Sequence, residues 1–143
     1  MAMAMIKKAK TRRGTVLIET ALVLIWIILI SMLLIEYGWF FLKAQQITNA
    51  ARQGARVGAR ADATIGDIHA AIDASLASGS PPVTGYSVTI APDPASLDAG
   101  QLFSVTVDLG YDDYGLGVSI VSFLGLRPPD ISKEVTMARE GSD

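Results

Sequence analysis

The sequence predicts an α+β protein: one long N-terminal transmembrane helix that extends into a small domain. Three observations support this class. Residues 15–42 form an apolar run of 28 residues with only two charges, Glu19 and Glu36. Alanine-rich sequence without proline continues the helical pattern over residues 43–61. In residues 62–143, apolar side chains repeat first with a helical period and then in alternation, which indicates one or two helices packed on an antiparallel sheet of about three strands.

The composition argues against several functional classes. The 143-residue chain has no cysteine and one histidine, so thiolate metal sites and most nucleophile–base pairs cannot form. We therefore expect no enzymatic activity, no cofactor and no metal site. His69 is interpreted as a solvated side chain. Three acidic residues cluster around one predicted loop: Asp108, Asp112 and Asp113. Their spacing is not that of an EF-hand calcium loop, and an acidic surface loop needs no ion.

The charges at the start of the chain predict its topology. Residues 1–14 contain five basic side chains and no acidic one, and they are Lys7, Lys8, Lys10, Arg12 and Arg13. A basic flank stays in the cytoplasm under the positive-inside rule, so the body after the helix is expected outside. Because this flank adjoins an apolar helix, we interpret it as a topology signal and expect no nucleic-acid partner.

The apolar run is long enough to cross a bilayer. At about 1.5 Å per residue it spans about 42 Å, and a bilayer core needs about 20 apolar residues. It contains no proline. Tyr37 and Trp39 lie near its end, as expected for aromatic anchors at the outer interface. Trp26 lies in mid-span and is expected to pack against another helix.

The continuation over residues 43–61 has one face of small or apolar residues at spacings of three and four, and these are Ile47, Ala50, Ala51, Gly54, Ala55 and Gly58. Small residues allow helices to approach closely. The face could lie on the protein's own domain, or it could form a packing seam with neighbouring subunits. Arg52, Arg56 and Arg60 follow one another at a spacing of four on another face.

The remaining segments predict the domain's other elements. Thr64 and Asp67 have capping-box spacing before a helix over 65–78, which should cover the sheet and bury Ile65, Ile68, Ile72 and Leu76. Alternation predicts strands over 86–91 and 103–109. Residues 93–100 and 110–117 are expected to be loops, and 119–126 could be a short helix or a strand. A third strand is predicted over 131–139, although Lys133 falls on its apolar side.

A carboxylate inside the apolar run needs an explanation. Glu19 follows Gly14 at the fifth position, after a basic flank. An ionisable group in a spanning helix is costly and is usually paired or functional. Alternatively, Glu19 could lie at the depth of the lipid headgroups, where its carboxylate would stay solvated and would need no partner. Glycine, basic flank and glutamate at this spacing resemble the processing signature of type IV prepilins and pseudopilins.

More residues resemble the narrower family of TadE-like pseudopilins of tight-adherence (Tad) pili and related secretion systems. The similar stretches are Arg13-Gly14, Ile18-Glu19, Ala21-Leu22-Val23-Leu24, Ile35-Glu36-Tyr37-Gly38 and Asn49-Ala50-Ala51-Arg52-Gln53-Gly54-Ala55-Arg56. Together they cover the first 60 residues. The family often has a proline after ALVL, where this chain has Ile25-Trp26. We expect a straighter helix as a result.

The resemblance implies a structural role as a minor or priming subunit of a pilus or pseudopilus in the bacterial inner membrane. A prepilin peptidase would cut between Gly14 and Thr15, removing residues 1–14 as a leader. Glu19 would then pair with the terminal amine of a neighbouring subunit, and Glu36 is a second expected assembly residue. The implied partners are the peptidase, other pilin or pseudopilin subunits and an inner-membrane assembly platform.

Three alternatives stay open at this point. The chain could be a single-pass anchor that carries a binding domain and is neither processed nor assembled. It could be secreted by a cleavable signal peptide, although its apolar run exceeds the usual length of about 7–15 residues. An anchored enzyme is the third alternative, which the scarcity of histidine and cysteine disfavours.

Overall fold

The computed structural model describes residues 12–114, 120–123, 125 and 129–141. Most of the leader, residues 115–117 of the second predicted loop and parts of 119–126 lie outside this range. The described elements follow the predicted α+β order: α1 (Arg12–Gly58), α2 (Ile65–Ala77), β1 (Tyr86–Ala91), the 3-10 turn η1 (Pro94–Ser96), β2 (Leu102–Leu109), α3 (Tyr111–Tyr114), α4 (Ile120–Phe123) and β3 (Ile131–Ala138).

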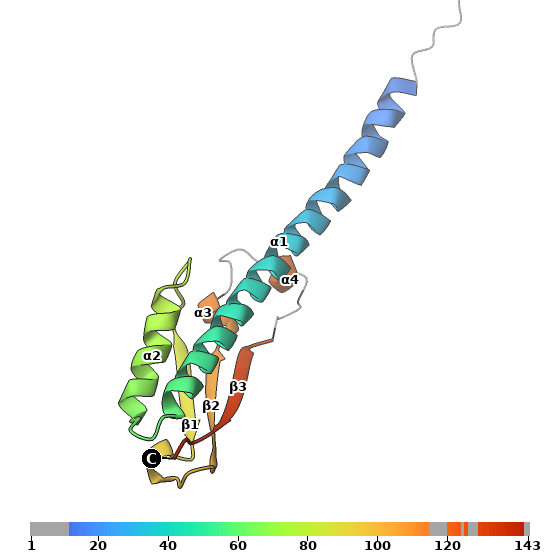
Figure 1. The fold of residues 1–143 in the computed structure, drawn as a ribbon. Helices are drawn as coiled ribbons and strands as arrows, with labels where there is room; N and C mark the ends of the chain where they lie inside the picture. The colour runs from blue at the N-terminus through green and yellow to red at the C-terminus, as the bar shows by residue number, and fades with distance from the viewer. Residues whose placement is uncertain (1–11, 115–119, 124, 126–128, 142–143) are drawn as a thin grey trace, which may run out of the picture.

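Helix α1 dominates the shape of the molecule. It is one helix of 47 residues, about 70 Å long at 1.5 Å per residue. It begins at Arg12 and ends at Gly58, so the predicted boundaries near Thr15 and residue 61 were each three residues too late. Its N-terminal part projects alone from the body, and its C-terminal part lies within the body (Figure 1). Its apolar window is entirely unburied and is a candidate membrane span by length and composition.

The sheet is an antiparallel meander in the order β1-β2-β3, as predicted. Tyr86 pairs with Leu109 at one end of the first ladder, and Leu102 pairs with Ala138 at one end of the second. Alternate side chains of the central strand are fully buried, and they are Phe103, Val105, Val107 and Leu109. The alternation that predicted β2 therefore reflects one buried face.

The helical layer differs from the predicted arrangement in one respect. Residues 65–78 were expected to cover the sheet, but α1 itself packs across β2 and β3. Helix α2 lies beside α1, next to the β1 side of the sheet (Figure 1). The Tyr86 hydroxyl of β1 donates to Asp73 Oδ1 of α2 at 2.6 Å. The end of the long helix thus forms the centre of the body's core because it contacts both α2 and the sheet.

The small-residue face of α1 is used inside the body. Ile47 and three alanines of this face are fully buried in the core. A Cβ atom added to Gly54 would lie 2.7 Å from the Ile72 side chain, and one added to Gly58 would lie 2.7 Å from Ile68 Cδ1. Small residues are needed here because α2 and β2 approach α1 closely. The small-residue face therefore packs on the protein's own domain, which was one of the two interpretations. The other interpretation, a packing seam with neighbouring subunits, is wrong for these residues.

Helix α2 begins with the predicted capping box. The Thr64 hydroxyl accepts the Asp67 N–H, and the Asp67 carboxylate accepts the Thr64 N–H. Ile68, Ile72 and Leu76 are buried, as predicted. Ile65 is not: it is 39% exposed, because it occupies the first position of the helix and lies beyond the packed interface with α1.

Two further predictions need correction or refinement. Residues 111–114, expected in a loop, form the helical turn α3, whose Tyr114 is buried. Within the ambiguous stretch 119–126, the described residues Ile120–Phe123 are helical. Strand β3 half-buries Val135 and Met137, and Lys133 stays exposed although it lies on the helix-facing side of this edge strand. An edge strand leaves such a side chain open to water.

Candidate processing and assembly site

The proposed cleavage bond lies in the first turn of α1. Gly14 and Thr15 follow two helical residues, and both are exposed. A Cβ atom added to Gly14 would meet nothing within 4 Å, so the glycine is not required by packing. Glycine lowers helix stability by roughly 1 kcal/mol relative to alanine. The Gly14–Thr15 bond therefore lies at an unpacked helix end that opens easily.

Glu19 lies one helical turn after this bond. Positions i and i+4 share a face of a helix, so Glu19 stands on the face of Thr15. The Glu19 side chain is exposed, and within the described part of the chain its carboxylate has no hydrogen-bond or ion-pair partner. Thr20 next to it donates its hydroxyl to Val16 O at 2.8 Å and is satisfied locally. Of these two neighbouring polar side chains, only the carboxylate of Glu19 lacks a partner.

Glu36 has a different environment. It is half-buried on α1, and the backbone N–H of Val121 in α4 donates to its Oε2 atom at 3.3 Å. This contact joins residues 85 positions apart in the chain. The sequence marked Glu36 as an assembly residue, which stays a prediction. Its contact with α4 was missed because no local pattern indicates it.

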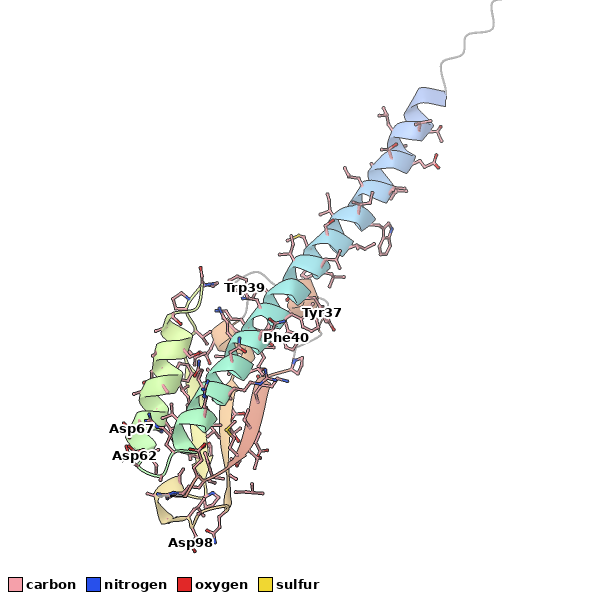
Figure 2. All side chains as sticks on the ribbon, in the orientation of Figure 1. Tyr37, Trp39, Phe40, Asp62, Asp67 and Asp98 are labelled. Atoms are coloured by element: carbon pink, nitrogen blue, oxygen red, sulfur yellow. The ribbon has the colours of Figure 1, made fainter. Side chains whose placement is uncertain are left out.

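An aromatic cluster joins α1 to the body directly after Glu36. The Trp39 indole N–H donates to Tyr114 O at 2.7 Å, and the Phe40 and Tyr114 rings lie 6.0 Å apart. Figure 2 shows Tyr37, Trp39 and Phe40 where α1 leaves the body. Trp39 is half-buried against the core. The body thus holds part of the Trp39 side chain, while Tyr37 is exposed, and the expected role of both as interfacial anchors stays a prediction.

Lys43 strengthens the same junction. It is only 4% exposed, and its ammonium donates to Pro81 O and Pro82 O at 3.3 and 3.2 Å. The Nζ atom also lies 5.3 Å from the centre of the Trp39 ring, within cation–π range. Burial lowers the Lys43 pKa, because the charged form loses hydration. The carbonyl groups and the ring offset that loss and join α1 to the segment after α2.

A shallow polar groove of about 370 Å³ opens between α1 and α2. Its lining residues are Asn49, Arg52, Gln53, Arg56 and Ser75. The two arginines are exposed and have no ion-pair partner among the described residues, whereas Arg60 lies 4.0 Å from Asp62. The spacing of the arginines predicted their common face, but the groove depends on the position of α2.

The three acidic residues at and before the second predicted loop come from two different elements. Asp108 lies in β2, and Asp112 and Asp113 lie in α3. The Asp113 carboxylate closes over the backbone at Gly85, where an added Cβ atom would lie 2.5 Å from Oδ1. Among the described residues, no group of three or more histidine or acidic side chains could hold a metal ion.

The comparison with protein families matches the segment that carries these features. Residues 14–56 match the model of the family described as TadE-like protein. This segment is TadE-like. The match begins at the predicted cleavage residue Gly14 and includes Glu19, Glu36 and the groove arginines. No curated protein and no solved structure matches the chain.

The matched segment spans 43 of the 143 residues, which is under a third of the chain. The single N-terminal apolar helix is the feature that suggests membrane anchoring. The TadE-like match ends within α1, so α2 and the sheet form a body outside the matched segment.

Proposed function

We propose that this TadE-like protein is a minor or priming subunit of a Tad-type pilus or related secretion system. A prepilin peptidase cuts the chain between Gly14 and Thr15, and the mature chain enters the filament through α1. The role is structural rather than catalytic. The observation that carries the proposal is the Glu19 carboxylate, which has no partner among the described residues and lies one helical turn after Thr15 inside the TadE-like segment.

Physical chemistry gives Glu19 a reason to remain in an apolar helix. A carboxylate in hydrocarbon is costly unless an opposite charge lies within a few ångströms. Cleavage creates an ammonium group at Thr15. In a filament, the ammonium group of one subunit can lie beside Glu19 of the next, so that assembly neutralises both charges. Removal of the leader also places Glu19 near the positive end of the helix dipole.

The division of α1 supports the same role. Its N-terminal part exposes apolar side chains on all sides, while residues 43–58 are fixed in the body. A subunit of a helical filament needs a continuous surface for its neighbours, because such contacts do not close into a ring. The proposal places the N-terminus in the cytoplasm and the body outside the bacterial inner membrane. There the exposed groove with Arg52 and Arg56 is available to acidic groups of assembly partners.

The processing step is tested by intact mass. The full chain is expressed in membranes with an active prepilin peptidase and is then extracted for mass spectrometry. We expect a mature chain that begins at Thr15. The variant Gly14→Leu should keep its leader, because a bulky side chain obstructs the cut. The matched control Gly38→Leu, at another glycine with no neighbour within 4 Å, should be processed normally.

Other results would contradict the proposal. An intact leader in the wild-type chain would support the unprocessed anchor with a binding domain. A mature start near residue 60 would support a cleavable signal peptide. Equal processing of Gly14→Leu and the wild type would show that the cut lies elsewhere.

A further inference from the structure

Helix α4 carries an apolar side chain that the body does not cover. Its sequence, IVSF, contains no charged residue. Phe123 is 89% exposed, more than any other large apolar side chain among the described residues. Burying a phenylalanine is favourable relative to leaving it in water. A single exposed apolar side chain is ordinary on a protein surface, so the place of Phe123 in the fold decides what it can contact.

The fold holds α4 beside one defined level of α1. The two helices are in contact, and Glu36 Oε2 accepts the Val121 N–H at 3.3 Å. Figure 1 shows α4 next to α1 where the free part of the long helix begins. The Tyr111 and Ser122 hydroxyls lie 3.1 Å apart and join α4 to α3. Phe123 is therefore attached to the body at the height of Glu36.

For a spanning core that begins at Val16, directly after the proposed mature N-terminus, this height coincides with the outer edge of the bilayer. Residues 16–35 are 20 in number and rise about 30 Å, which equals the thickness of a typical hydrocarbon core. Glu36 then lies at the outer boundary of the core. Tyr37 and Phe41, the next large exposed side chains on α1, fall in the interfacial layer, where aromatic residues are enriched.

We infer that α4 is a second, monotopic membrane contact, which inserts Phe123 into the outer interface of the bilayer beside α1. The occupant of this surface is lipid, because the attachment point lies at the end of the spanning run. The inference rests on the anchoring of α1 in the membrane and goes beyond the proposed pilus role. Two contact points would fix the tilt and rotation of the body on the membrane before assembly.

The test uses single-cysteine reporters, since the chain has no cysteine of its own. Phe123→Cys, Ile27→Cys and Asp98→Cys are each labelled with nitrobenzoxadiazole in the full chain. The variants are reconstituted at low density in phosphatidylethanolamine/phosphatidylglycerol vesicles. Ile27 lies in mid-span, and Asp98 lies at the opposite end of the body from the aromatic cluster (Figure 2). Quenching is measured with aqueous iodide and with lipids that carry a spin label near the headgroup.

We expect the Phe123 reporter to have a blue-shifted emission and a several-fold lower iodide quenching than the Asp98 reporter. Only the Phe123 reporter should be quenched strongly by the headgroup-proximal spin label. If iodide quenches the Phe123 reporter as strongly as the Asp98 reporter while the Ile27 reporter is in lipid, the inference is overturned. Protection from iodide without lipid quenching also overturns it, because a protein neighbour is then the occupant. An Ile27 reporter in water would instead overturn the anchoring itself, independently of the processing result.

Discussion

At the residue scale, Gly58 is a position where α1 closely approaches the sheet. A Cβ atom added there would lie 2.7 Å from Ile68 Cδ1 and 2.9 Å from Phe103 Cε2. Both of these neighbours are fully buried. The Phe103 ring has little freedom to move because α1 and the sheet enclose it. The glycine therefore sets the spacing between helix and sheet at the end of α1.

We predict that Gly58→Ala destabilises the body by about 1–2 kcal/mol. Overpacking costs about 1–3 kcal/mol, and the better helix propensity of alanine returns at most about 1 kcal/mol. The matched control is Gly66→Ala in α2, where an added Cβ atom makes an ordinary contact at 3.6 Å. This control should be neutral or stabilising. Thermal unfolding of the full chain in detergent, followed by near-ultraviolet circular dichroism, measures both variants. Equal melting temperatures for the two would contradict the packing described at Gly58.

At the element scale, the capping box gives α2 a pH dependence. Hydrogen bonds from the Thr64 side chain and backbone hold the pKa of Asp67 below its ordinary value of 3.8. A carboxyl group whose folded-state pKa is lowered stabilises the fold fully above its ordinary pKa. This contribution is lost as the pH falls through the lower folded-state value. The cap therefore acts at neutral pH and weakens in acid.

We predict that Thr64→Ala lowers the stability at pH 7 by about 1 kcal/mol, which is typical for loss of an N-cap hydroxyl. The difference from the wild type should be smaller at a second, acidic pH below 3.8, because the contribution of the ionised Asp67 is lost progressively there. Thr84→Ala, at an exposed threonine before β1, is the control and should change little at either pH. Melting curves at both pH values provide the measurement. If the stability difference between Thr64→Ala and the wild type grows in acid, the direction assigned to the pKa shift of Asp67 is wrong.

The elements also show what a sequence can predict. The strand over 103–109 was recognised because one of its faces is buried and the other is not, and α2 was recognised by its cap and its period. The sequence does not decide which surface packs on the small-residue face of α1, since the same glycines would suit a neighbouring subunit or the protein's own α2 and Phe103. The turns α3 and α4 are too short to show a helical repeat of apolar residues in the sequence. Their positions depend on contacts across the fold.

The spacing within the candidate site follows from the sequence more directly than the packing of the body does. Gly14, Thr15 and Glu19 lie within one or two turns of a single helix, so their relation follows from spacing alone. The contact of Glu36 with Val121 and the hydrogen bond from Trp39 to Tyr114 connect residues 85 and 75 positions apart. Such contacts require the tertiary structure. For this reason the sequence gives the position of Glu19 relative to Thr15 but misses the junction, and the role of Glu19 stays a prediction.

At the scale of the whole molecule, one helix serves two environments. Its first part exposes apolar side chains, as a membrane-spanning helix would, and its last part is the centre of the body's core. The Trp39 hydrogen bond and the buried Lys43 fix the body to α1 at the transition. A force or displacement applied to the spanning part is therefore transmitted to the body through a packed junction rather than through a flexible linker.

Incorporation of the Glu19→Ala variant into filaments tests the central claim most directly. Filaments are sheared from cells that express the wild type, Glu19→Ala or the neighbouring control Thr20→Ala, and the mature chain in the filament and membrane fractions is quantified. All three chains should be cut before Thr15. We expect Glu19→Ala to remain in the membrane and Thr20→Ala to assemble like the wild type, because only the first loses the carboxylate that meets the new ammonium group. Wild-type incorporation of processed Glu19→Ala would contradict the account.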